Sequence, residues 1–329
     1  MKRETLTANY LKTIVWYDNT LIDWANAGKQ YVLDDKVKQL GHDTYGFGDA
    51  AIVSFNGVYA FIYKRLGTKG LLLKNGKILR EINRSYYCAE VYEYPAAFVT
   101  GGDITYLIHC PIAYNQLDFE NVETGELITN KPGRTPADIF HSRLEISPDN
   151  SFLMSKGWWW HPLDAIEVFK IEDCINNPLL LDESKLYPVR GVEICTASFI
   201  DSTKVLIGSS DEVIDEEYLE TLPSKHIAIW DLTTGKLSKS VKVKAEFGNL
   251  FAINEKFAWD LFTYPKIIDI DTGEIIDKIE EFDSGRQRSS IIYSADNVPQ
   301  IIFNRETKQI AISGKDEIEI FTPDELISW

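Results

Sequence analysis

Residues 224–236 read SKHIAIWDLTTGK, and this stretch decides the fold class. Ile227, Ile229 and Leu232 are interleaved with small or polar residues and lead into the turn Thr234-Gly235. Glycine adopts a positive φ at low cost, and a tight turn between antiparallel strands requires that conformation. The stretch is therefore predicted to form a β-hairpin.

The same hairpin pattern returns along the chain, at 71–82, 117–130, 166–181, 267–279 and 318–329. Another strand pair with a polar turn precedes each hairpin, and the turn markers are Asn56, Gly102, Asp149, Ser202, Glu255 and Glu306. These markers are 46, 47, 53, 53 and 51 residues apart. Two hairpins in a period of about 50 residues make four strands per unit, which is typical of a β-propeller blade.

Two phrases carry a resemblance to a known superfamily. LEISPDNSFLMS (144–155) and SKHIAIWDLTTGK (224–236), with the dipeptide Trp230-Asp231, resemble the repeats of WD40 and YVTN-type propellers. The resemblance extends over the repeats at 49–323 and implies an all-β propeller of four-stranded antiparallel blades. Such propellers include both enzymes and scaffolds, so the fold alone does not decide the function.

We expect one propeller domain over residues 1–329. Six repeats account for 49–323, and the N-terminal 1–48 adds strands at 9–34 that either close the ring or form a seventh blade, because a propeller closes by pairing strands from both chain ends. Seven blades are expected, and six or eight remain open. Helix is expected in less than about 10% of residues, at 171–176 and 216–221.

Charge and cysteine usage limit the partners. The 34 Lys and Arg against 50 Asp and Glu leave a net charge of −16, which repels phosphate backbones and anionic membranes. We therefore expect neither nucleic acid nor a membrane as partner. The 4 cysteines lack metal-ligand spacing and no signal peptide is seen, so reduced thiols in the cytoplasm are expected.

One face of the ring is expected to carry the binding site. In a blade with strands a to d, antiparallel alternation puts the b–c and d–a loops on one face, here called the b–c/d–a face. Its b–c loops at 110–116, 157–165 and 209–225 are enlarged in consecutive blades. Candidate binding residues in them are Tyr114, Asn115, Trp158, Trp159, Trp160, His161 and Asp164. Because successive strand residues point to opposite sides, three adjacent Trp cannot all enter one core, and at least one is expected to be exposed.

Basic residues recur in the d–a loops despite the acidic composition. They are predicted to surround the channel mouth and to bind a carboxylate or phosphate group, as Arg does bidentately. The candidates are Arg84, Arg134, Arg190, Arg286 and Arg288.

The sequence shows no nucleophile motif, no P-loop and no dinucleotide fingerprint, so no catalytic residue, cofactor or metal site is assigned. The main hypothesis is a non-enzymatic binding or scaffold propeller for a protein partner or a small anionic ligand. The alternative is a hydrolase or lyase acting on an anionic or sugar-like ligand at the channel mouth.

Overall fold

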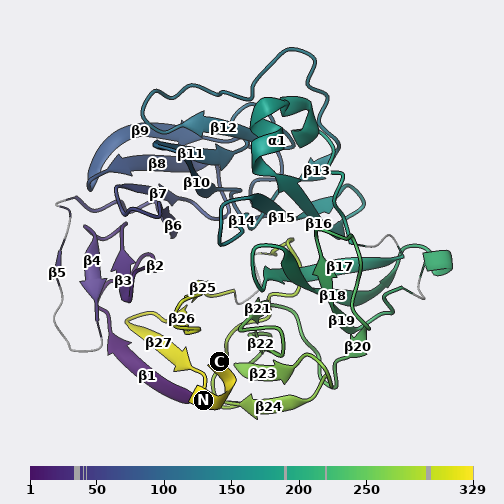
Figure 1. The fold of residues 1–329 in the computed structure, drawn as a ribbon. Helices are drawn as coiled ribbons and strands as arrows, with labels where there is room; N and C mark the ends of the chain where they lie inside the picture. Colours follow the sequence, from purple (N-terminus) through teal and green to yellow (C-terminus); the bar gives the residue numbers. More distant parts are fainter. Residues whose placement is uncertain are drawn as a thin grey trace.

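Seven antiparallel sheets are arranged in a ring in the computed structural model (Figure 1). The structure describes residues 1–32, 38–39, 41, 43–188, 191–218, 221–293 and 298–328. In six of the sheets the earliest strand in the chain lies nearest the centre of the ring, and in the sheet that joins the two chain ends this position belongs to β25 (Figure 1). The chain is therefore a seven-bladed β-propeller, as the sequence predicted.

The first four blades follow the chain in order. Blade 1 contains β2 (Val15–Tyr17), β3 (Thr20–Asp23), β4 (Lys29–Tyr31) and β5 (Lys38–Gln39); blade 2 contains β6 (Ala50–Val53), β7 (Tyr59–Tyr63), β8 (Lys69–Lys74) and β9 (Lys77–Asn83). Blade 3 contains β10 (Ala97–Gly101), β11 (Ile104–His109) and β12 (Asp118–Asn121), with a bridge from Glu120 to Leu127 in the place of a fourth strand. Blade 4 contains β13 (Ile139–Phe140), β14 (Glu145–Ile146), β15 (Phe152–Trp159) and β16 (Leu163–Lys170); β13 and β14 both pair with β15 and form an interrupted innermost strand.

The last three blades complete the ring. Blade 5 contains β17 (Val192–Phe199), β18 (Lys204–Val213), β19 (His226–Asp231) and β20 (Val241–Lys242); blade 6 contains β21 (Leu250–Ala252), β22 (Phe257–Asp260), β23 (Lys266–Asp269) and β24 (Ile275–Lys278). Blade 7 contains β25 (Ile301–Phe303), β26 (Ile310–Ser313), β27 (Glu317–Thr322) and, as its outermost strand, β1 (Lys2–Thr7).

The ring closes through the two chain ends. β1 pairs with β27 from Lys2 opposite Thr322 to Thr7 opposite Glu317. The closing strand thus lies before the expected 9–34 segment, whose described part forms blade 1 beside blade 7. There, the Trp16 indole Nε1 donates to the carbonyl oxygen of Ile302 at 3.2 Å.

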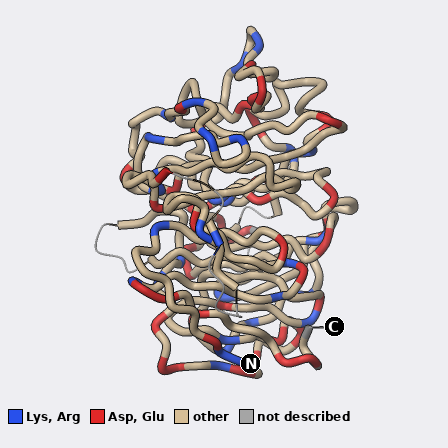
Figure 2. Tube along the Cα trace, turned by 90° about the vertical axis from the view of Figure 1, so that its left-hand side faces the viewer, with Lys and Arg blue, Asp and Glu red and all other residues tan. Residues whose placement is uncertain are grey.

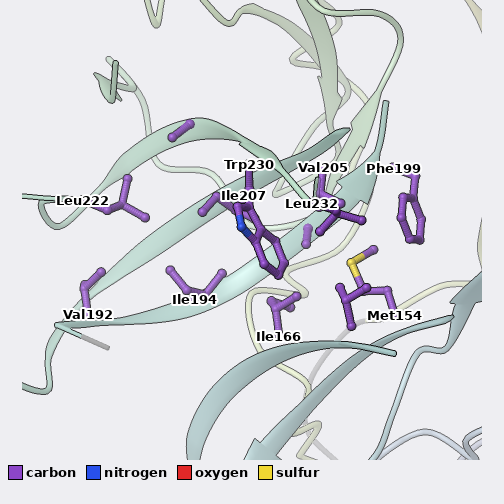
Figure 3. Packing of buried hydrophobic residues seen from close by; sticks show 13 residues of the cluster. Met154, Ile166, Val192, Ile194, Phe199, Val205, Ile207, Leu222, Trp230 and Leu232 are labelled. Atoms are coloured by element: carbon purple, nitrogen blue, oxygen red, sulfur yellow. The ribbon is translucent and has the colours of Figure 1, made fainter. Parts of the chain in front are cut away.

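Apolar side chains fill the spaces between neighbouring blades. Figure 3 shows the cluster between blades 4 and 5, where Trp230 of the Trp-Asp dipeptide packs among Ile166, Ile194 and Ile207. A four-stranded sheet has two faces, and in a ring each face is buried against the next blade. This explains why strands such as Tyr59–Tyr63 are buried along their whole length.

Within the described part of the chain, helix is confined to four short segments: α1 (Ile171–Asn176), η1 (Pro178–Leu181), η2 (Glu216–Tyr218) and α2 (Glu325–Ser328). The prediction for 171–176 is confirmed. That for 216–221 holds over 216–218, while residues 219 and 220 lie outside the described residues. Among the described residues, no helix has the length and apolar character to span a bilayer.

Two predicted loops are partly strand. The 157–165 segment is a tight hairpin, because β15 continues to Trp159 and β16 begins at Leu163. Similarly, β18 extends to Val213 and shortens the 209–225 loop. The same face also carries d–a connections at 84–96 and at 279–300, the latter described over 279–293 and 298–300.

Candidate binding surface and central cavity

A stack of aromatic rings forms on the b–c/d–a face where blades 3 and 4 meet. Phe140 of β13 lies directly opposite Trp158 of β15, and their ring centroids are 3.8 Å apart with planes at 2°. Tyr114, from the b–c loop of blade 3, stacks on Phe140 at 4.5 Å. Gly157 permits the close approach of the two strands, since a Cβ there would lie 2.1 Å from the Phe140 carbonyl oxygen.

The outer end of this stack is open to solvent. Trp160 is 47% exposed, while Trp158 is only 4% exposed. Tyr87, from the loop between blades 2 and 3, is 43% exposed and lies 6.3 Å from the Trp160 ring and 4.9 Å from the Tyr114 ring. Together with their exposed sequence neighbours Tyr86 and Ile112, these side chains make up what we call the aromatic surface: Tyr86, Tyr87, Ile112, Tyr114 and Trp160.

Internal hydrogen bonds hold the supporting loop in place. The Tyr114 hydroxyl donates to Oδ1 of Asp138 at 2.5 Å, and burial together with this carboxylate raises the pKa of Tyr114 to about 12. Asn115 Nδ2 donates to the carbonyl oxygens of Pro136 (3.3 Å) and Ala137 (2.9 Å). Asn115 therefore fixes the blade 3 to blade 4 connection.

The remaining candidate residues near the three Trp lie in different surroundings. Trp159 is half-buried, and strand alternation directs it away from Trp158. His161 is exposed in the hairpin turn with φ 96°. Asp164 is buried and accepts hydrogen bonds from the Ser290 backbone N–H (2.8 Å) and hydroxyl, so it anchors the blade 6 to blade 7 loop.

Two of the arginines predicted at the channel mouth, Arg84 and Arg134, are buried in internal contacts. Arg84 is 5% exposed, and its guanidinium donates to four backbone carbonyls, those of Gly67, Ala89, Tyr92 and Glu93. The Arg134 side chain is buried in ion pairs with Asp118 (3.3 Å) and Asp182. Both arginines satisfy internal acceptors, which is how a buried charge is accommodated.

The two other predicted arginines that the structure describes have different surroundings. Arg288 pairs with Glu246 at 2.7 Å and lies over the Phe262 ring, whereas Arg286 is exposed. Arg190 lies outside the described residues. Basic and acidic residues alternate over the edge of the ring seen in Figure 2.

Two d–a loops meet over the centre of this face. Tyr92 and Ile291 form an isolated antiparallel bridge, and the Ile292 N–H donates to the Val91 carbonyl oxygen at 2.8 Å. Nearby, Gln287 Nε2 lies 3.4 Å from Oε1 of Glu93. The loops at 84–96 and 279–300 thus contact each other across blades that lie far apart in sequence.

A cavity of about 280 Å³ lies at the centre of the ring, lined by innermost strands of blades 2, 4, 6 and 7 and by residues of the two meeting loops. Its charged side chains are Arg65, Glu93, Arg143, Glu145, Lys156 and Arg305. None of these was among the sequence candidates, because each lies in or beside an ordinary-looking strand or turn.

Glu145 is the central carboxylate of the cavity. Its Oε2 lies 2.7 Å from Lys156 Nζ, and its Oε1 pairs with Arg305. Burial alone would raise the pKa of Glu145, but the charges of Lys156 and Arg305 outweigh it and hold the pKa below its ordinary value. Burial, assisted by Arg143 and Arg305, lowers the pKa of Lys156 despite Glu145.

A solved structure with a similar fold is known, although no family model and no curated protein sequence matches the chain. Among solved structures, a chain of the "Crystal Structure of Mitotic Checkpoint Complex" is similar with a TM-score of 0.59 over 97% of this chain and 91% of that chain. The two chains therefore share a fold. The identity is 9%, so the likeness concerns the fold alone.

The described residues contain no group of three or more His, Cys, Asp or Glu arranged to hold a metal ion. The four cysteines are free thiols, three of them buried. The described residues form two candidate sites: an aromatic surface on one face and a charged cavity at the centre of the ring.

Proposed function

We propose that this propeller is a protein-interaction scaffold that binds a protein partner through the aromatic surface. The observation that carries the proposal is the 47% exposure of Trp160 at the end of a packed aromatic stack. Exposed Trp and Tyr on a rigid support are enriched at the energetic centres of protein interfaces. They also bind at low entropic cost, because few of their torsions must be frozen.

The supporting layer makes this surface rigid. Trp160 lies 5.9 Å from Phe140 and 6.0 Å from Trp158, both of them buried. Its neighbours Tyr87 and Tyr114 come from two other loops, so the surface joins connections of blades 2, 3 and 4. The similar chain belongs to the crystal structure of a mitotic checkpoint complex, which agrees with a protein-binding role.

Affinity capture with mass spectrometry tests the proposal. Wild type is compared with Trp160→Ala and Tyr87→Ala, each checked for an unchanged melting temperature. The matched control is Phe55→Ala, because Phe55 is 90% exposed in the a–b turn of blade 2, on the opposite face.

We expect partners that wild type and Phe55→Ala both capture to be lost from Trp160→Ala and reduced with Tyr87→Ala. Truncation of an interface hot spot weakens binding by about 2 kcal/mol or more. The proposal fails if Trp160→Ala retains every partner, or if Phe55→Ala loses the same partners.

A further inference from the structure

The central cavity is cationic although the chain is strongly acidic. Among the described residues that line it, four side chains are cations (Arg65, Arg143, Lys156 and Arg305) and two are carboxylates (Glu93 and Glu145). The chain as a whole has a net charge of −16. This local excess of two positive charges therefore runs against the overall composition.

The two carboxylates are already occupied. Glu145 binds Lys156 and Arg305 and also accepts the Phe199 N–H at 3.2 Å. Glu93 lies 3.9 Å from Arg65, whose guanidinium also donates to the Val298 carbonyl oxygen at 2.5 Å. No carboxylate of the described residues lies within ion-pair distance of the remaining cation, Arg143; its charge acts at longer range on the buried Asp164, where it opposes the rise in pKa that burial causes.

Arg143 is also held in an uncommon backbone conformation. Its φ of 44° is in the left-handed region, which glycine adopts freely and other residues at a cost. The residue lies between β13 and β14, where the innermost strand of blade 4 is interrupted. Irregularities of this kind redirect side chains and are common next to binding sites.

The guanidinium of Arg143 makes only long internal hydrogen bonds. Nε is 3.3 Å from the Lys156 carbonyl oxygen, and Nη2 is 3.4 Å from that of Cys195. By contrast, Arg305 Nη1 donates to the Ile146 carbonyl oxygen at 2.7 Å. The Arg143 guanidinium thus retains N–H groups that can donate to a ligand on the wall of the cavity. Its backbone conformation would carry a smaller free-energy cost for glycine than for arginine.

We propose that the central cavity binds a small anion bearing carboxylate or phosphate groups, and that Arg143 is its principal ligand. Arginine suits both groups because its planar fork donates two parallel hydrogen bonds to them. Lys156 and Arg305 lie beside it and balance a second negative charge. A volume of about 280 Å³ is at the small end of ligand sites and fits a metabolite rather than a peptide.

This site is separate from the aromatic surface. The anion-binding proposal can therefore be tested independently of the proposed protein partner. The cavity is reached by side chains from both faces: Glu93 and Gln287 come from d–a loops, while Arg305 comes from the a–b turn of blade 7. An anion bound on the axis would therefore contact several blades at once. An anion that binds the folded state and not the unfolded state raises the melting temperature of the protein.

Thermal unfolding and calorimetric titration with inorganic phosphate, succinate and citrate test the proposal. Ionic strength is held constant with sodium chloride. The variants are Arg143→Gly and Arg143→Gln, and the charge-matched control is Lys185→Gln, because Lys185 is 67% exposed and pairs with Glu183 outside the cavity.

We expect saturable stabilisation of wild type and Lys185→Gln by at least one of these anions, with the phosphate and carboxylate probes distinguishing the two groups. Both Arg143 variants should bind at least about tenfold more weakly, since a charge-assisted hydrogen bond is lost. Arg143→Gly should melt no lower than wild type without anion, because glycine relieves the backbone cost.

Either of two results overturns the proposal. One is that none of the three anions stabilises wild type beyond the sodium chloride control. The other is that Arg143→Gly retains the wild-type response to an anion that binds.

Discussion

Arg3 and Glu319 lie 316 positions apart in the chain, yet the Arg3 Nε donates to the Glu319 Oε2 at 2.8 Å across the β1–β27 pair. The Glu319 side chain is only 2% exposed and also accepts a hydrogen bond from the Thr5 hydroxyl. Ring closure therefore joins a strand pair to a buried carboxylate whose partners, among the described residues, both lie in the first strand.

Deletion of residues 1–7 should expose the edge of β27 and leave Glu319 without its partners. We expect a lower melting temperature and a shift to aggregates in size-exclusion chromatography, because unpaired strand edges associate. Arg3→Gln keeps the strand and should cost only about 1–3 kcal/mol of unfolding free energy. A deleted chain that stays monomeric with unchanged melting would show that β1 is dispensable for closure.

Trp158→Ala and Trp160→Ala should differ sharply in stability, although the residues are two apart. Trp158 is buried against Phe140, so its truncation leaves a cavity and should cost about 3–5 kcal/mol in urea unfolding. Trp160 lies at the exposed end of the stack, and its truncation should cost less than about 1 kcal/mol. Equal losses would mean that Trp160 belongs to the core.

A fully buried ion pair stabilises the second and third strands of blade 6. Lys266 Nζ lies 2.9 Å from Asp260 Oδ2, both side chains are 0% exposed, and burial raises the pKa of Asp260 despite the lysine. Lys266→Met should cost about 3–5 kcal/mol, because it leaves a buried carboxylate without its countercharge. The double variant with Asp260→Asn should recover part of this loss in chemical denaturation, whereas strict additivity would contradict the coupling.

Glu167 should make stability depend on pH. It is buried in β16, and burial together with the charge of Glu183 raises its pKa from 4.5 to about 7. The folded state therefore holds this proton more tightly than the unfolded state. Its contribution to stability is complete below about pH 4.5 and is lost as the pH rises toward and through 7.

Glu167→Gln removes this titration. Relative to wild type, the variant should become more stable as the pH rises from 5 to 8, by up to about 3 kcal/mol, as urea unfolding at several pH values would measure. A stability difference that is independent of pH would contradict the raised pKa. The amide is isosteric with the carboxyl group and keeps the side-chain volume. A pH-dependent difference in stability therefore does not arise from a change in packing.

The positions of secondary structure followed from local signals. The turn at Thr234-Gly235 and the strand before it form as the sequence indicated, and the short helix at 171–176 was also found. The aromatic surface was partly predictable as well, because three adjacent Trp in a strand cannot share one core, and Trp160 is the one most exposed.

The surroundings of the arginines were not predictable in the same way. Arg84 and Arg134 lie in loops that are basic in sequence, but in the structure both side chains are buried and bonded to internal acceptors. Arg143 and Arg305 stood in unremarkable segments, yet both reach the axial cavity. Whether a charged side chain is buried, paired or free depends on acceptors contributed by segments far away in the sequence. The spacing of residues along the chain does not indicate which acceptors those are.

The sequence by itself thus determined the strands, the turns and the propeller class, because β-alternation and glycine turns act over a few neighbouring residues. Only the tertiary structure decided that Lys2–Thr7 closes the ring and that Glu145 meets Arg305, 160 positions away. Closing the ring brings the innermost strands together on one axis. Contacts on that axis arise from the geometry of all seven blades, and local sequence preferences do not specify them.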